Sequence, residues 1–143
     1  MITYSSDFKR VKIKDVHLML THSYWTPGIT ENEIQKGIQN SALVMGAFSD
    51  DDRQVGFLRV VSDKVRFAYI LDVIVAEDFR HQGIGQNLVK MAMADPELKD
   101  VYKWLLTTMD AHKVYEKCGF ELLQDTERWM AIMNPRPERK VFD

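Results

Sequence analysis

The residues Arg80-His81-Gln82-Gly83-Ile84-Gly85 are the most informative about the fold, because a strand-like run ends just before them and a helical pattern begins among them. The run 66–75 is rich in aromatic and β-branched residues, which is typical of a strand. Apolar residues then recur with helical spacing as far as Asp95-Pro96, at Ile84, Leu88, Met91 and Ala92. The sequence therefore predicts a strand, a glycine-containing turn and an amphipathic helix in direct succession.

Such a corner is suited to binding an anion. The first turn of a helix leaves backbone N–H groups without partners, and the positive end of the helix dipole lies there. Gly83 and Gly85 remove side chains that would block close approach of a ligand, Arg80 could add positive charge, and Gln86 could add a donor. The alternative is that the two glycines only form a turn that lets the helix pack on the sheet.

Two better-known phosphate motifs do not fit this corner. A dinucleotide fingerprint needs a third glycine three residues after Gly85, where Leu88 stands. A Walker A loop needs Gly-Lys-Ser or Gly-Lys-Thr, and neither occurs in the chain.

The chain before the corner predicts two short helices and two further strands. A first helix is expected after Asp15, and Thr30 followed by Glu33 forms a capping-box pattern that predicts a second at 31–40. Strand-like runs separated by short polar turns, which favour antiparallel pairing, follow at 42–48 and 55–61.

The chain after the corner predicts a strand, a helix and a last strand. These are expected at 101–107, at 111–118 with a stop at Gly119, and at 128–133; Asp110 is expected to cap the helix. The tail 134–143 is polar and expected to be flexible. Together with a short strand near the start, the pattern predicts one domain over 1–143. Its class is α/β (α+β), with a central, mostly antiparallel mixed sheet flanked by about four helices.

Composition excludes several classes of function. Of the 143 residues, 45% are hydrophobic and 28% charged, and the net charge of -2 supplies no basic field for nucleic acid or acidic lipid. One cysteine, Cys118, excludes an internal disulfide and a cysteine metal cluster, and no other metal-ligand spacing occurs. With neither a signal-peptide pattern nor an apolar run long enough to span a bilayer, we expect a cytoplasmic protein without a membrane partner.

Three blocks in order resemble one family. Arg80-x-x-Gly83-x-Gly85 resembles the pyrophosphate loop of the GCN5-related N-acetyltransferases, the GNAT family. Asp72-Val73-Ile74-Val75 is similar to that family's fourth strand, and Tyr115-Glu116-Lys117-Cys118-Gly119-Phe120 is similar to its Tyr-Glu-Lys-x-Gly-Phe signature. The resemblance is convincing over 54–120 and extends over the whole chain. It implies the GNAT acyl-CoA N-acyltransferase fold.

The resemblance implies acetyl-CoA as co-substrate, lying where the fourth and fifth strands diverge. The pantetheine arm would pair with the backbone of Val73 and Val75, the Val73 amide would donate to the thioester oxygen, and the pyrophosphate would lie on N–H groups of 81–85. Thr108 stands where the family often has an asparagine that contacts pantetheine. The implied cofactor-binding set is Val73, Ile74, Val75, Arg80, His81, Gln82, Gly83, Ile84, Gly85, Gln86, Thr108 and Tyr115.

For catalysis, the resemblance implies direct attack of a primary amine on the thioester in a ternary complex. Tyr115 matches the family's general acid, although it also lies on the apolar stripe of its helix and could be a core residue. Asp72 could accept a proton through water, hold a cationic acceptor, or make only a local hydrogen bond; a water chain could also replace a dedicated base. His112 is a weaker candidate base.

Tyr24, Trp25 and Tyr69 are expected on the acceptor side, although the first two could simply close the end of the core. The acceptor would be an amine of a small molecule or a peptide, and a homodimer is possible. The alternative function is a non-catalytic acyl-CoA-binding regulatory module.

Overall fold

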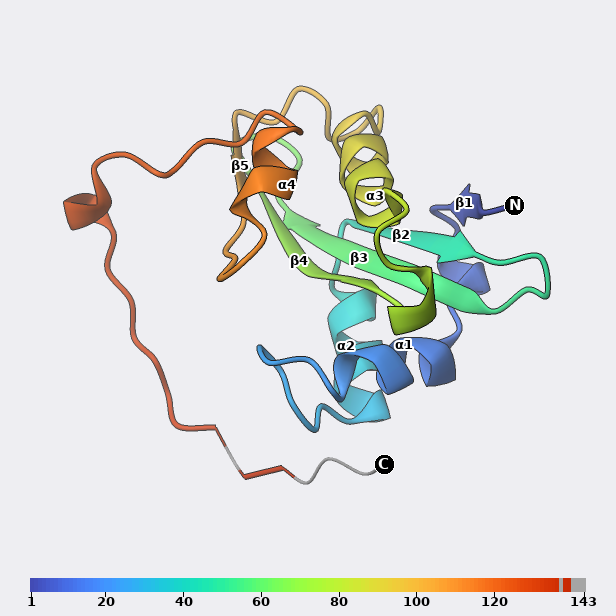
Figure 1. The fold of residues 1–143 in the computed structure, drawn as a ribbon. Coiled ribbons are helices and arrows are strands. Elements are labelled where there is room, and N and C mark those ends of the chain that lie inside the picture. The colour runs from blue at the N-terminus through green and yellow to red at the C-terminus, as the bar shows by residue number, and fades with distance from the viewer. Residues whose placement is uncertain (137, 140–143) are drawn as a thin grey trace.

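The fold is built on a five-stranded sheet, seen in a computed structural model that describes residues 1–136, 138 and 139 (Figure 1). The strands follow one another across the sheet in chain order: β1 (Thr3–Ser5), β2 (Leu43–Phe48), β3 (Gln54–Ser62), β4 (Phe67–Val75) and β5 (Lys103–Leu105). The first three pairings are antiparallel, and β4 pairs with β5 in parallel. This confirms the mixed, mostly antiparallel sheet.

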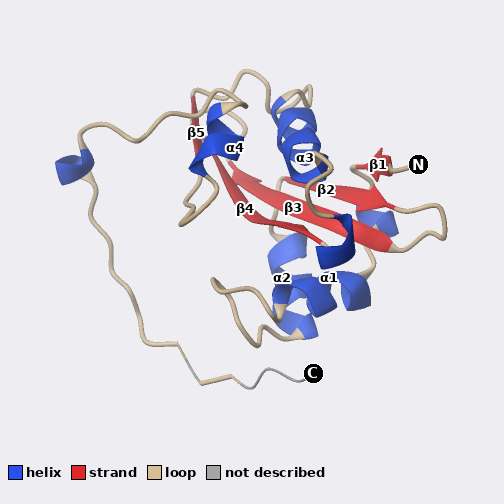
Figure 2. Cartoon of the chain, in the orientation of Figure 1, coloured by secondary structure: helices blue, strands red, loops and turns tan. Residues whose placement is uncertain are grey.

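Helices cover both faces of the sheet, as Figure 2 shows. Helices α1 (Ile13–Leu20) and α2 (Glu31–Gln39) pack with Phe57 and Ile74 in one apolar cluster. Helix α3 (Ile84–Met93) packs in a second cluster on the other face, and the short helix α4 (His112–Glu116) lies beside β5. No helix in the described part of the chain has the length and apolar character that crossing a membrane would require.

Local sequence determines where the helices begin. The Thr30 hydroxyl accepts a hydrogen bond from the Glu33 N–H at 3.1 Å, and the Glu33 carboxylate accepts one from the Thr30 N–H at 3.0 Å. This capping box supplies partners for two otherwise free donors at the start of α2, so the predicted start is confirmed. The described residues also form three single-turn 3-10 helices, at Phe8–Arg10, Glu77–Phe79 and Thr126–Arg128.

Helix α3 approaches the sheet closely at Gly56 in β3. A methyl group at this position would lie 3.0 Å from the Ala47 Cβ, 3.1 Å from the Leu88 Cδ1 and 3.2 Å from the Ile84 Cγ2. We expect Gly56→Ala to lower the free energy of unfolding by about 1–3 kcal/mol, because an overpacked core must push its neighbours apart. Urea unfolding measures the change.

Gly37→Ala in α2 is the matched control, because its new methyl group would meet only the Arg59 guanidinium, at 3.4 Å. A helical alanine is favoured over glycine by about 0.5–1 kcal/mol, so this variant should be at least as stable as the parent protein. Equal stability of Gly56→Ala and the parent would show that α3 can move away from the sheet at no cost.

Strand β4 contains a bulge at Asp72. Phe57 of β3 pairs with Ile74 and Arg59 pairs with Leu71, so two residues of β4 lie opposite one residue of β3. Asp72 has the left-handed backbone conformation, with φ of 59°. A bulge bends its strand, and β5 pairs with β4 only over residues 67–69. The two strands therefore diverge beyond this point.

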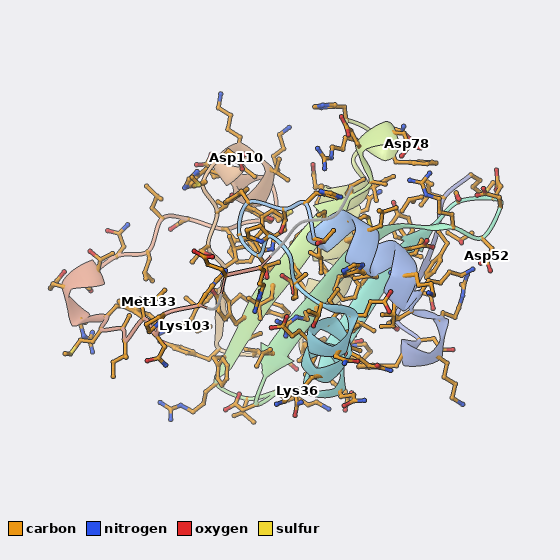
Figure 3. All side chains as sticks on the ribbon, turned by 90° about the horizontal axis from the view of Figure 1, so that it is seen from below. Lys36, Asp52, Asp78, Lys103, Asp110 and Met133 are labelled. Atoms are coloured by element: carbon orange, nitrogen blue, oxygen red, sulfur yellow. The ribbon has the colours of Figure 1, made fainter. Side chains whose placement is uncertain are left out.

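The predicted last strand at 128–133 is wrong. Arg128 ends the 3-10 helix, and the residues after it lie in an extended arm, residues 121–136, that leaves the sheet (Figure 1). Figure 3 shows Met133 on this arm. Met130 and Ile132 are 96% and 89% exposed. A strand needs a partner edge, and 129–133 is apolar at every position, without the alternation that would select one face.

Two other elements are shorter than predicted, and the described part of the tail makes contacts. Strand β5 has three residues instead of the expected 101–107, and α4 spans five residues of the expected 111–118. The expectation that the tail is flexible falls partly on residues 137 and 140–143, which lie outside the described residues. Arg136 and Arg139 contact the loop before α2 and α2 itself.

Candidate functional site

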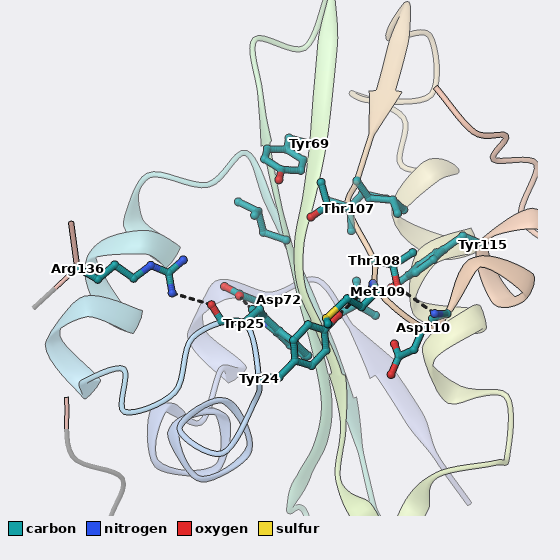
Figure 4. Close-up of a pocket in the computed structure, with 15 residues that line it drawn as sticks. Tyr24, Trp25, Tyr69, Asp72, Thr107, Thr108, Met109, Asp110, Tyr115 and Arg136 are labelled. Carbon is teal, nitrogen blue, oxygen red and sulfur yellow. Dashed lines mark hydrogen bonds between the residues drawn. The ribbon is translucent and has the colours of Figure 1, made fainter. Parts of the chain in front are cut away.

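A cleft of about 420 Å³ opens between β4 and the segment that follows β5 (Figure 4). The bulge turns β4 away at this point, and the loop between α1 and α2 forms another wall. The residues that line it include most of those predicted for the thioester and acceptor sites: Tyr24, Trp25, Tyr69, Asp72, Val73, Thr108 and Tyr115. Strand divergence and loop closure thus bring together residues that are far apart in the sequence.

Asp72 is held on both of its carboxylate oxygens. The Trp25 Nε1 donates to Oδ1 at 3.0 Å, and the Arg59 Nε donates to Oδ2 at 2.8 Å. The side chains are only 10% exposed for Asp72 and 22% for Arg59, so the pair is shielded from solvent. Sequence reasoning missed Arg59, although an arginine inside the apolar run 55–61 is a signal that it needs a buried partner.

Tyr24 reaches across the cleft. Its phenol oxygen accepts a hydrogen bond from the Met109 N–H at 3.2 Å, and its ring packs edge to face on Trp25 at 5.0 Å between ring centres. The loop between α1 and α2 is therefore linked both to the bulge, through Trp25, and to the segment after β5, through Tyr24. Both aromatic residues line the cleft, whereas their roles stay predictions.

Tyr115 lies on the opposite wall, half-buried. Its ring packs edge to face on Phe120, with 6.2 Å between centres. Burial raises the pKa of its phenol to about 12, and nearby Tyr24, Cys118 and Asp110 act in the same direction. Burial also raises the pKa of the Cys118 thiol, which disfavours a nucleophilic thiolate. Tyr115 therefore keeps its proton throughout the neutral and moderately alkaline range.

This pKa predicts how stability depends on pH. A folded-state pKa near 12 lies above the unfolded value near 10, so the contribution of Tyr115 is fully present below pH 10 and is lost as pH rises through 12. Between pH 9 and 11 the parent protein should lose more unfolding free energy than Tyr115→Phe. The difference has an upper limit of about 1.4 kcal/mol, reduced by partial exposure.

Urea unfolding of both proteins at the two pH values measures this difference. Because other titrating groups are common to both proteins, they cancel in the comparison. Equal losses would mean that the Tyr115 phenol is not desolvated in the fold.

The glycine corner lies at the end of β4 and contains unpartnered backbone donors. Gly83 is the N-cap of α3, and both Gly83 and His81 have positive φ, at 79° and 64°. Among the described residues, none accepts a hydrogen bond from the N–H groups of residues 81–86. A methyl group at Gly83 would meet nothing within 4 Å, and one at Gly85 only the Val75 Cγ2 at 3.7 Å. The corner is thus open enough for a ligand to approach the backbone.

The edge of β4 that leads to this corner faces away from β3. The Ala76 N–H donates to the Val55 carbonyl of β3, while the Val75 carbonyl accepts from the Arg80 Nε at 3.0 Å. Since backbone groups alternate along a strand, the polar groups of Val73 point to the same open side as those of Val75. One strand edge therefore joins the cleft to the glycine corner.

The remaining predicted residues are placed as follows. The Thr108 hydroxyl accepts from the Ala111 N–H at 3.0 Å, whereas Ala111 is the N-cap of α4, so the expected cap by Asp110 is wrong. Because the chain turns before α4, the Thr108 hydroxyl can reach the Ala111 N–H although Thr108 stands three residues before the N-cap. His112 is exposed, as are His81 and Gln82 at the corner. Ile84 is buried and Gln86 half-buried, so Ile84 could offer a ligand only its backbone.

No group of three or more metal-ligating side chains comes together in the described part of the chain. Arg136 and Met109 also line the cleft, and sequence reasoning missed both. Met109 bonds Tyr24 through its backbone N–H, and the identity of a side chain does not indicate such a bond.

Comparison with known proteins points to one family. A sequence model of the acetyltransferase (GNAT) family matches residues 13–120. A crystal structure from Xanthomonas campestris pv. campestris, described as an acetyltransferase of the GNAT family, is 33% identical, with a TM-score of 0.88 and 94% of each chain covered. A GNAT family acetyltransferase from Streptococcus pneumoniae is 28% identical, with a TM-score of 0.72, covering 96% of this chain and 100% of its own.

A more distant structure shows how widely this fold extends. Glucosamine-6-phosphate N-acetyltransferase from Arabidopsis thaliana is 18% identical, with a TM-score of 0.65 and 96% and 98% of the two chains covered, a likeness of fold alone. No curated protein sequence matched the chain.

Proposed function

The chain belongs to the acetyltransferase (GNAT) family, and from this we propose that it transfers the acetyl group of acetyl-CoA to a primary amine by direct attack in a ternary complex. Family membership supports acetyl transfer in general. The observation that carries the finer proposal is the open edge of β4. It joins a cleft lined by Asp72 and Tyr115 to a corner with unpartnered N–H groups.

The residues present fit a CoA molecule. The N–H groups of 81–85 would hold the pyrophosphate, because bare glycines and the N-terminus of α3 favour phosphate oxygens. Arg80 and Gln86 stand at the same corner. The open backbone of Val73 and Val75, on either side of Ile74, would pair with the pantetheine arm, with Thr108 across the cleft.

Bound acetyl-CoA supplies an activated thioester, and the chain needs only to position it and stabilise charge. In our proposal the Val73 N–H donates to the thioester oxygen, where negative charge develops as the amine attacks. Holding both reactants in one cleft removes much of the entropic barrier. The attacking nitrogen must be neutral, and its excess proton leaves to water or to Asp72.

Tyr115 is the proposed proton donor to the departing sulfur. Its phenol lines the cleft and, with a pKa near 12, remains protonated at every pH at which the enzyme would work. The same burial makes complete transfer to a thiolate less favourable, because a thiol has a pKa near 8.5. We therefore propose that Tyr115 stabilises the sulfur by a hydrogen bond as bond breaking proceeds.

Asp72 has a more restricted proposed role. Both of its oxygens already accept hydrogen bonds, although each keeps a second lone pair. Asp72 holds Trp25 against the cleft and places negative charge beside the thioester site, where it would attract a cationic amine. It would accept the proton only through water. Tyr24, Trp25 and Tyr69 would then form the walls around the acceptor.

Two measurements test the proposal. Calorimetry should show CoA binding, and a thiol reagent should detect CoA release from acetyl-CoA when a suitable primary amine is present. Saturating acetyl-CoA at a hundred times its dissociation constant should stabilise the fold by about 2.7 kcal/mol. Binding without thiol release for any amine would favour the regulatory module, and absence of binding would overturn both.

The setting of this activity is also a proposal. The half-buried single thiol of Cys118 fits a reducing compartment, so we propose a cytoplasmic enzyme. Its acceptor would be a small-molecule or peptide amine, without nucleic-acid or membrane partners, and a homodimer would be compatible with an active site built from one chain.

A further inference from the structure

The C-terminal arm returns to the acceptor side of the cleft. The Arg136 Nη1 donates to the Trp25 carbonyl at 2.8 Å, and Arg139 pairs with Glu33 of α2. Figure 4 shows Arg136 beside Trp25, on the far side of Asp72 from Tyr115 and Thr108. These contacts place the Arg136 guanidinium at the edge of the cleft that faces the acceptor.

Arg136 has an unusual charge environment within this cleft. Among the described residues that line it, Arg136 is the one cationic side chain, whereas Asp72 and Asp110 are acidic. The Arg59 guanidinium, behind Asp72, is paired with that carboxylate. Arg136 instead bonds a neutral carbonyl, and no carboxylate of the described residues forms an ion pair with it. A guanidinium has five N–H donors, so it can bind a further group while keeping this bond.

The cleft is therefore polarised along its length. Asp110, and Asp72 with its charge partly compensated by Arg59, lie near the thioester site, and Arg136 lies on the acceptor side. Such a field orients a molecule that carries a cationic amine at one end and an anion at the other. A guanidinium matches the two oxygens of a carboxylate or a phosphate in a bidentate geometry.

We propose that Arg136 binds an anionic group of the acceptor, so that the substrate class is a primary amine that also carries a carboxylate or a phosphate. This inference rests on the proposed acetyl transfer and makes Arg136 a specificity-determining residue. Because Arg136 is exposed, the effect is moderate and weakens at high salt.

Matched pairs of acceptors test the inference. One pair is an amino acid and its carboxamide, and the other is an amino sugar phosphate and the parent amino sugar. Thiol release gives kcat and KM for each. The parent protein should favour at least one anionic member about tenfold in kcat/KM, through KM, as expected for one charge-assisted hydrogen bond at an exposed site. The preferred pair identifies carboxylate or phosphate.

Variants assign the preference to one side chain. Arg136→Gln should remove it and leave the dissociation constant of CoA unchanged, because the guanidinium lies on the acceptor side of the cleft. Arg136→Lys should keep part of it, and Arg136→Glu should shift preference toward a diamine. Arg128→Gln, on the same arm but outside the cleft, is the matched control and should behave as the parent protein.

The outcomes separate the two proposals. Turnover without preference for either anionic member, or a preference that survives in Arg136→Gln, overturns the role of Arg136 and leaves acetyl transfer standing. A raised dissociation constant for CoA in Arg136→Gln would assign the guanidinium to the cofactor and also overturn it. No thiol release with any amine would remove the proposed function, and the acceptor class would fall with it.

Discussion

Gly85→Val is expected to weaken CoA binding at least a hundredfold and to leave the fold intact. In the free protein a Cβ at this position would meet only the Val75 Cγ2, at the ordinary van der Waals distance of 3.7 Å, so the backbone there can carry a side chain. It would, however, occupy the space through which phosphate oxygens reach the backbone N–H groups. Loss of two charge-assisted hydrogen bonds at about 1.5 kcal/mol each corresponds to more than a hundredfold in affinity. Calorimetry with CoA measures the effect.

Met91→Val is the matched control for this variant. It places the same side chain on the same helix, at a position that is exposed and remote from the corner. Its affinity for CoA should equal that of the parent protein, and thermal unfolding should show both variants folded. If Gly85→Val bound CoA as tightly as Met91→Val, the pyrophosphate would have to lie elsewhere.

Tyr115→Phe is expected to lower kcat by about a hundredfold, as for the loss of one hydrogen-bond donor to charge that develops in the transition state. The change removes only the phenol oxygen, so the ring can keep its contact with Phe120. The departing sulfur would lose its hydrogen-bond donor while CoA is held as before. Steady-state thiol release should therefore show a fall in kcat that is much larger than the change in the dissociation constant of CoA measured by calorimetry.

Tyr102→Phe provides the comparison, since Tyr102 is 83% exposed and lies just before β5, outside the cleft. It should leave kcat unaltered. A Tyr115→Phe enzyme with full kcat would show that Tyr115 is a packing residue of α4, which is the alternative that its apolar helical stripe also allows.

Local patterns predicted most of the fold. The capping box at Thr30 and Glu33, and the strand-like runs of β2, β3 and β4 with polar turns between them, depend on neighbours in the sequence, so they could be recognised without tertiary information. The glycine corner was predictable for the same reason. The segment 128–133 was not, because an apolar run forms a strand only where an edge is free to receive it.

The site was predictable only in part, because its electrostatics depend on partners far apart in the chain. Arg59 and Trp25 meet at Asp72 only after the sheet and the first loop have assembled. Arg136 reaches the cleft from a tail that looks featureless as a sequence. The bulge itself has no strong local signal, since an aspartate with positive φ can occur in any turn.

The bulge in β4 also changes which face of the sheet each residue supplies. Before it, Ala68 and Ile70 face the α3 side, whereas after it the even-numbered Ile74 belongs to the α1 and α2 side, and Val75 turns toward α3. The extra residue thus shifts the alternation of side chains between the two faces of the sheet by one position. Deleting it would straighten the strand and exchange the inner and outer faces of everything downstream. A single-residue deletion here should therefore cause misfolding, and selection against misfolded protein would remove it whatever its effect on activity. Selection for a well-packed core thus also preserves the cleft.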